Sequence, residues 1–237
     1  MKFGNGCWLQ KEGTACFSPA EVYFTKIESN RVVLCAPTHK IVHRGDTLGG
    51  VNLTIEITTP MPDVIRVKTY HYKGALKNAP AFDLCMDEAS EIEAYEDGEE
   101  LCVRSGRSEL RIKKKNWGMT YYSGGRKCCT SSWRDLAYMR TDFKGDAYVT
   151  SGDDDAYMRQ RLSLGVGELI YGLGERFGPF IKNGQSIDIW NEDGGTSTEL
   201  SYKNIPFYLS NKAYGVFVNH SEKVSFEVAS ETVNKVQ

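Results

Sequence analysis

Acidic side chains are the residues of this chain that could do the most chemistry, but their spacing along the sequence defines no site. The chain has 31 Asp and Glu residues among 237. Glycoside hydrolysis needs two carboxyl groups on either side of one bond, and no spacing here says which two would converge. Asp153-Asp154-Asp155 lacks the further oxygen ligands and glycine of a calcium loop, which favours a turn. The residues alone therefore identify no catalytic pair.

Histidine, glycine and serine patterns add no further site. The four histidines have none of the spacing of a zinc site. Gly172-Leu-Gly174 fails as a dinucleotide fingerprint, because Gly178 is wrongly spaced and no crossover helix follows. These glycines instead indicate a turn that passes close to neighbouring backbone. No serine lies in a G-x-S-x-G elbow. The sequence therefore predicts neither a metal nor an organic cofactor.

Cysteine usage and hydropathy bear on the compartment. The seven cysteines follow no C-x-x-C spacing. Adjacent Cys128 and Cys129 should point to opposite faces of a strand, which suits neither a shared metal nor a mutual disulfide. The segment Met1–Cys7 is no secretory signal, and nowhere is there a run of ~20 apolar residues. We therefore expect a cytoplasmic protein with buried, reduced thiols and no membrane partner.

The charge balance argues against a nucleic-acid partner. The net charge is −2 and the isoelectric point about 6.1, whereas nucleic-acid binders concentrate basic residues on one face. The only basic run is Lys113–Lys115, which we expect at a solvated strand end. With 41% hydrophobic residues, the chain can build a core.

Alternation with a period of two dominates the chain and predicts strands. They are expected at 21–27, 31–36, 51–57, 64–70, 92–95, 101–104, 109–113, 118–122, 157–164, 187–190, 206–209, 214–219 and 224–228. Only 79–90 could form a short helix. Asn204–Phe207 is expected as an edge or interdomain strand, since proline cannot donate in a central ladder. Closely spaced strands without helices predict an all-β fold, an antiparallel β-sandwich, formed as one domain over residues 1–237. The pattern of Val233–Gln237 predicts the start of another strand, so we expect the chain to be a piece of a longer protein.

Three segments, in order, carry a family resemblance. They are Tyr171–Phe177 (YGLGERF), Trp190–Thr198 (WNEDGGTST) and Tyr202–Tyr208 (YKNIPFY). They resemble glycoside hydrolase family 31, and within it the α-xylosidase branch. Tyr214–His220 fits the strand that follows in that family. The likeness is sharp over residues 165–230, while the first 160 residues agree mainly in β character.

The resemblance implies a galactose-mutarotase-like N-terminal sandwich that precedes a (β/α)8 barrel. In the family, the barrel carries the aspartate nucleophile and the aspartate acid/base of a retaining α-glycosidase. Neither motif is present here, and a barrel alone needs ~250 residues. The chain is therefore expected to be a non-catalytic domain, inactive when isolated, of an α-xylosidase-like enzyme that is a homo-oligomer at full length.

The same resemblance assigns a role to the loop at 190–198, which would reach the sugar site of the barrel. Asp193 matches best the acidic position that binds substrate hydroxyls in related α-glucosidases, and Glu192 is a weaker candidate. The alternative for Asp193 is a turn residue before Gly194-Gly195. Trp190 could offer an apolar face to the sugar or pack at the loop base. Glu175 and Arg176 are expected to satisfy backbone groups or to pair at the domain junction.

Two other functions remain open from the sequence. The parent enzyme could be an α-glucosidase rather than an α-xylosidase, because the loop is the only basis for the choice. The chain could also be a free-standing carbohydrate-binding module, since sandwiches often serve that role and 11% of residues are aromatic. In every case, the expected ligand is a carbohydrate.

Overall fold

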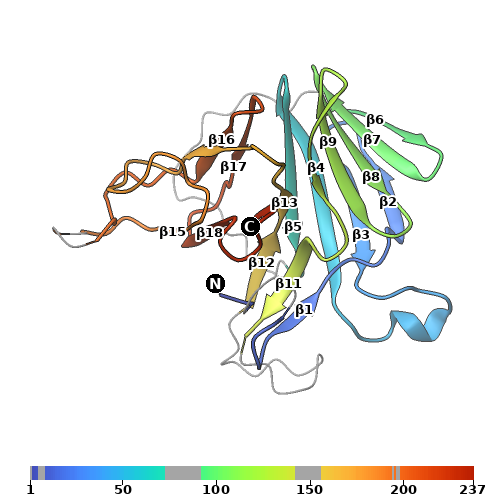
Figure 1. The fold of residues 1–237 in the computed structure, drawn as a ribbon. Helices are drawn as coiled ribbons and strands as arrows, with labels where there is room; N and C mark the ends of the chain where they lie inside the picture. The colour runs from blue at the N-terminus through green and yellow to red at the C-terminus, as the bar shows by residue number, and fades with distance from the viewer. Residues whose placement is uncertain (1, 5–8, 73–91, 142–155, 194, 196–197) are drawn as a thin grey trace, which may run out of the picture. The chain divides into compact units, whose positions relative to one another are not determined.

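The computed structural model describes residues 2–4, 9–72, 92–141, 156–193, 195 and 198–237, and it is almost entirely β (Figure 1). Within these ranges the only helical element is a single 3-10 turn, η1 (Arg44–Thr47). The helix predicted at 79–90 lies outside the described residues. Contacts divide the chain into a smaller unit, Met1–Lys11 with Arg161–Gln237, and a larger unit, Glu12–Gln160. The expectation of one domain over residues 1–237 stays a prediction.

The larger unit holds three antiparallel sheets (Figure 1). One has the order β2 (Phe24–Ile27), β3 (Val32–Pro37), β4 (Asn52–Met61), β5 (Val64–Tyr70). Another has the order β10 (Arg126–Ser131), β9 (Gly118–Ser123), β8 (Ser108–Lys113), β7 (Glu100–Ser105), β6 (Glu93–Asp97). The third joins β1 (Ala15–Phe17), β11 (Leu136–Arg140) and β12 (Ala156–Gln160).

The core of the larger unit follows from the alternation in its strands. On β4, Leu53, Ile55 and Ile57 are fully buried while the residues between them are partly exposed. They share one apolar cluster with residues of β3, β7 and β8, so the two larger sheets pack face to face. Burying one such side chain stabilises the fold by about 1.5–3 kcal/mol. A shift of the β4 pairing register by one residue would turn all three side chains to solvent. The predicted sandwich is confirmed.

Strand β10 departs from regular pairing. Its register against β9 shifts between Lys127 and Cys129, which leaves Cys128 as the extra residue of a bulge. Cys129 is buried and Cys128 half-buried. The described cysteines form no disulfide with one another, and among them only Cys102 and Cys129 are buried.

The smaller unit packs two further antiparallel sheets against one core. One has the order β13 (Leu162–Ser163), β19 (Lys235–Val236), β18 (Val224–Val228), β15 (Gln185–Ile189). The other has the order β14 (Ile170–Gly172), β16 (Phe207–Ser210), β17 (Tyr214–Phe217). Between them, the Tyr208 ring meets the Phe226 ring edge-on, at 6.3 Å between centroids and 88° between planes.

The expected edge strand at Asn204–Phe207 is wrong. Residues 204–206 belong to no strand, and β16 begins only at Phe207. This strand is central, since it pairs with β14 on one side and β17 on the other. Pro206 is tolerated because it lies one residue before the ladder, where no N–H is required. Its carbonyl still accepts the Val218 N–H at 2.8 Å.

A buried carboxylate stabilises the smaller unit. Glu168 is 3% exposed. It accepts hydrogen bonds from Ser210 Oγ and Tyr214 Oη, both at 2.6 Å, and from Gly165 N at 2.8 Å, and Lys212 Nζ lies 3.0 Å away. Burial raises the pKa of Glu168, but these four donors outweigh it and hold the pKa below its usual value. The carboxylate is therefore ionised and fully hydrogen-bonded in the folded unit.

Candidate sugar-binding loop

The loop of interest leaves the sheet at the end of β15 and returns before β16. Its base is packed against the turn Gly172-Leu-Gly174. Gly174 has φ 86°, and a Cβ there would lie 2.8 Å from Ile205 N and closer still to the Lys203 carbonyl oxygen. Only glycine fits such an approach. The prediction of a turn that passes close to neighbouring backbone is confirmed.

Arg176 joins the turn to both sides of the loop base. Its Nε donates to the Leu173 carbonyl at 3.2 Å. Its Nη2 donates to the Asp188 carbonyl and to Asn204 Oδ1. Burial lowers the pKa of the guanidinium. Arg176 is expected from the sequence to satisfy backbone groups, and these bonds to the Leu173 and Asp188 carbonyls confirm that structural role.

Asn204 continues this network into the loop. Its Nδ2 donates to the Trp190 carbonyl at 2.8 Å, to Asn191 Oδ1 at 2.9 Å and to the Ser201 carbonyl at 2.6 Å. One side chain thus joins the outgoing and the returning arms of the loop.

Asp193 lies exposed beyond this base. Its Oδ1 accepts the Gly195 N–H at 3.0 Å. The Gly195 N–H lowers the pKa of Asp193 most, and the Tyr202 hydroxyl lowers it further. The group is therefore ionised at neutral pH, and it makes the local turn bond that the sequence offered as the alternative. That bond uses one carboxylate oxygen and still leaves acceptor capacity for a ligand hydroxyl.

Asp193 lines a hollow of about 260 Å³. The other described lining residues are Glu175, Phe177, Gly195, Leu200, Ser201, Tyr202 and Lys203. The aromatic rings of Phe177 and Tyr202 are 79% and 66% exposed there. Glu175 pairs with Lys203 Nζ at 3.0 Å, an exposed ion pair that contributes little stability. The hollow is smaller than the roughly 300–1,000 Å³ of a complete small-molecule site, as a partial site would be.

The other two predicted residues are placed differently. Glu192 is exposed, and neither it nor Trp190 is among the described residues that line the hollow. Trp190 is 48% exposed, so its indole is not part of the core. The contact of either residue with a sugar stays a prediction. Sequence reasoning missed Phe177 and Tyr202 as lining residues, although both lie in the motifs that carry the family resemblance.

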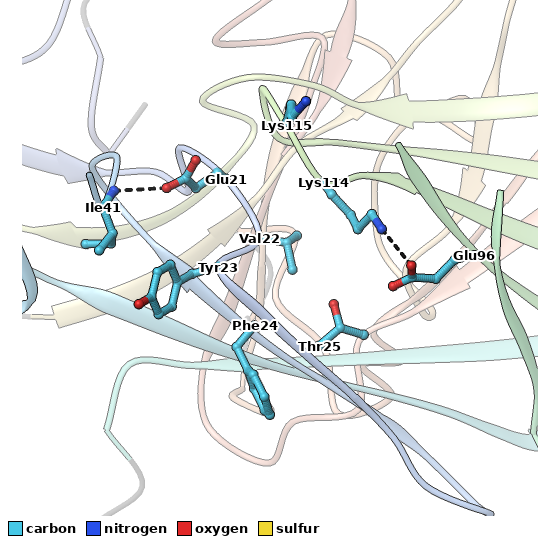
Figure 2. A pocket seen from close by; sticks show the side chains of 9 residues that line it. All are labelled: Glu21, Val22, Tyr23, Phe24, Thr25, Ile41, Glu96, Lys114 and Lys115. Carbon is cyan, nitrogen blue, oxygen red and sulfur yellow. Dashed lines mark hydrogen bonds and ion pairs between the residues drawn. The ribbon is translucent and has the colours of Figure 1, made fainter. Parts of the chain in front are cut away.

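A larger hollow of about 540 Å³ lies in the larger unit, and its lining residues are drawn in Figure 2. Its charged groups are already engaged. Glu21 accepts the Ile41 N–H at 2.9 Å and Lys114 pairs with Glu96 at 2.9 Å, as Figure 2 shows. Lys115 pairs with Glu99 at 2.5 Å. This hollow contains none of the predicted site residues, so its size does not make it the better candidate.

Two further findings concern metals and membranes. Among the described residues, no three His, Cys, Asp or Glu side chains gather in a way that could hold a metal ion. No helix in the described part of the chain is long and apolar enough to cross a bilayer.

Comparisons with known proteins place this fold and loop in a family. The family model of the glycosyl hydrolase 31 N-terminal galactose mutarotase-like domain matches residues 54–227. An alpha-xylosidase of Emericella nidulans is 40% identical over 247 residues, which cover 100% of this chain and 32% of the relative. Alpha-xylosidase XylQ of Lactiplantibacillus pentosus is 39% identical over 239 residues, which cover 100% of this chain and 30% of that protein. The chain thus spans about a third of the length of these relatives.

Solved structures agree with the fold. The cycloalternan-forming enzyme from Listeria monocytogenes, in complex with a pentasaccharide substrate, matches with a TM-score of 0.71 at 16% identity, over 94% of this chain and 19% of that one. A GH31 alpha-xylosidase from a soil metagenome, complexed with xylose, matches with a TM-score of 0.61 at 14% identity, over 90% and 30% of the two chains. Such low identities show the fold alone. The family match over residues 54–227 confirms the resemblance seen in the sequence, and the chain belongs to glycosyl hydrolase family 31 through its N-terminal galactose mutarotase-like domain.

Proposed function

We propose that this domain is the non-catalytic N-terminal part of a retaining α-xylosidase-like enzyme and lends its loop at 190–198 to the sugar site of a neighbouring (β/α)8 barrel. The observation that carries the proposal is the exposed, ionised Asp193 at the edge of a small hollow, on a loop braced at its base. A carboxylate can accept hydrogen bonds from two sugar hydroxyls. The two relatives at about 40% identity, both named alpha-xylosidases, support xylose as the sugar.

The chemistry of the hollow favours binding over catalysis. A glycosidase needs one carboxyl group whose raised pKa lets it donate a proton to the leaving group. The pKa of Asp193 is lowered, and the second acid of the hollow, Glu175, is paired with Lys203. Neither group is prepared to act as the acid, so the proton donor is assigned to the barrel, together with the nucleophile that the family resemblance places there.

Replacing Asp193 in the full-length enzyme tests the proposal. Asp193→Asn keeps the size of the side chain and removes its charge. Since hydrogen bonds to charged groups contribute about 1.5–3 kcal/mol, we expect KM for an α-xyloside to rise about 10–100-fold. The matched control is Glu222→Gln, an exposed acid of the same unit that does not line the hollow, and it should leave KM unchanged. Unchanged kinetics in Asp193→Asn would remove Asp193 from the sugar site.

The chain alone should not hydrolyse a chromogenic α-xyloside, whereas the full-length enzyme should. Turnover by the 237-residue chain at a rate comparable with the intact enzyme would refute a non-catalytic role. The relative kcat/KM of the full-length enzyme on α-xylosides and α-glucosides decides between the two specificities.

A free-standing carbohydrate-binding module is the second candidate, because the exposed rings of Phe177 and Tyr202 lie beside Asp193, and sugars pack against such faces. Titration calorimetry of the chain with xylose and isoprimeverose separates the two functions. A self-sufficient module binds measurably, whereas a partial site binds scarcely at all.

A further inference from the structure

The base of the loop is held by two side chains that do not line the hollow. We infer that Arg176 and Asn204 are positioning residues that hold Asp193 in place for the sugar, an inference that rests on the proposed function of the loop. Together they form what we call the clamp: Arg176 Nη2 bound to Asn204 Oδ1, with Arg176 Nε and Asn204 Nδ2 donating to backbone carbonyls of the surrounding chain.

The Arg176 half of the clamp joins three separate segments. Its acceptors belong to the glycine turn at Leu173, to β15 at Asp188 and to the returning arm at Asn204. The planar guanidinium fork can serve divergent acceptors in this way, whereas a lysine presents a single point charge. Arg176 Nη1 is buried and has no hydrogen-bond partner within the described residues. A buried donor without an acceptor destabilises a fold, and the three hydrogen bonds of Nε and Nη2 offset this cost.

In the Asn204 half of the clamp, side-chain hydrogen bonds join the two arms of the loop where a β-ladder would use backbone hydrogen bonds. Among the described residues, the backbone hydrogen bond between the two arms, from Glu192 N to Ser201 O, is long at 3.5 Å. By contrast, Asn204 Nδ2 on the returning arm donates across to the Trp190 carbonyl at 2.8 Å and to Asn191 Oδ1 at 2.9 Å. The separation of the two arms is therefore set mainly by this one amide.

The clamp bears on Asp193 through short stretches of chain on both arms. Asp193 follows Asn191, which accepts from Asn204 Nδ2 at 2.9 Å and from Asn204 N at 3.3 Å. Tyr202, which lines the same hollow as Asp193, precedes Asn204 on the other arm. If the arms separate, the spacing between Asp193 and Tyr202 and the direction of the carboxylate change together. Neither Arg176 nor Asn204 lines the hollow, so both act through Asp193.

The substitution Asn204→Asp tests one half of the clamp without the other, because it keeps the acceptor for Arg176 and removes the donor of Asn204. The new carboxylate can still accept from Arg176, but it has no N–H to donate and would face the Trp190 and Ser201 carbonyls with negative charge. Arg176→Lys removes the fork and keeps the charge. A matched control is Asn211→Ala, because the Asn211 amide also bonds backbone groups of another segment, Leu169 N and Gly167 O at 3.0 Å each, in the same unit but outside the loop.

Hydrogen–deuterium exchange of the full-length enzyme gives a readout that does not depend on sugar. In Asn204→Asp, and to a lesser degree in Arg176→Lys, we expect the amides of Glu192 and Gly195 to exchange at least about tenfold faster. Asn211→Ala should leave these amides unchanged. Unaltered exchange in Asn204→Asp would overturn the clamp.

A double-mutant cycle on KM then tests whether the clamp acts through Asp193. Asn204→Asp alone should raise KM for an α-xyloside about tenfold and change kcat less than about twofold. In an Asp193→Ala background, the same substitution should add less than about twofold. If Asn204→Asp raised KM as much in the Asp193→Ala background as in the native enzyme, the positioning role would be overturned while the proposed function would stand. An unchanged KM in Asp193→Ala would instead overturn the proposed function, even where the exchange of the loop still rises.

Discussion

Replacing Gly174 with alanine should destabilise the smaller unit more than replacing Gly184, although the two glycines have almost the same backbone conformation. Their φ angles are 86° and 84°. An L-residue in this left-handed region costs about 1–2 kcal/mol at either position. At Gly184 an added Cβ has nothing within 4 Å, whereas at Gly174 it would meet Ile205 N at 2.8 Å, Asn204 Cα at 3.0 Å and the Lys203 carbonyl oxygen. Moving that backbone costs a further 1–3 kcal/mol or so.

The expected losses are therefore about 1–2 kcal/mol for Gly184→Ala and about 2–5 kcal/mol for Gly174→Ala. Urea unfolding measures the two losses of stability. Hydrogen exchange of the β16 amides serves as the probe, because this strand belongs to the smaller unit. With a slope of roughly 1–3 kcal/mol per molar urea, the midpoints of the two variants should differ by about 1 M. Equal midpoints would refute the reasoning, since they would mean that the glycine turn does not lie against residues 203–205.

Three other predictions follow from the described contacts. Glu168→Gln should lower the free energy of unfolding by about 2–4 kcal/mol at pH 7. Because the folded pKa of Glu168 lies below its unfolded value of about 4.3, this stabilisation should be lost as pH falls through the folded pKa, and urea unfolding at pH 7 and pH 3 measures the difference. Tyr202→Phe should raise the pKa of Asp193 toward its ordinary value in a carboxyl NMR titration, and an unchanged pKa would contradict an influence of the Tyr202 hydroxyl on this carboxylate. In the native chain, iodoacetamide should label half-buried Cys128 well before buried Cys102, whose pKa is raised by burial, and equal labelling would contradict this packing.

The strands that form the main core could be predicted because their alternation has a direct physical cause. On β4, every second side chain must enter the apolar layer, and Leu53, Ile55 and Ile57 display that requirement in the sequence itself. Strand β10 could not be predicted in this way. Its residues, Arg126–Ser131, are polar or small, and the bulge at Cys128 interrupts the period of two.

The candidate site was predictable only in part. The motif around Asp193 identified the acidic residue, and the structure places it in a hollow. The closeness of Phe177 and Tyr202 to Asp193 depends on how the two arms of the loop are held together. That arrangement comes from the hydrogen bonds of Arg176 and Asn204, and the spacing of residues along the chain does not reveal which acceptors those side chains find.

A structure of the full-length protein with xylose bound would measure whether this domain contributes to a sugar site in the proposed barrel. We expect a carboxylate oxygen of Asp193 to lie about 2.6–3.2 Å from a sugar hydroxyl. A sugar whose hydroxyls are all bound by residues of the barrel, with the Asp193 carboxylate more than about 3.5 Å away and no bridging water, would contradict the proposal.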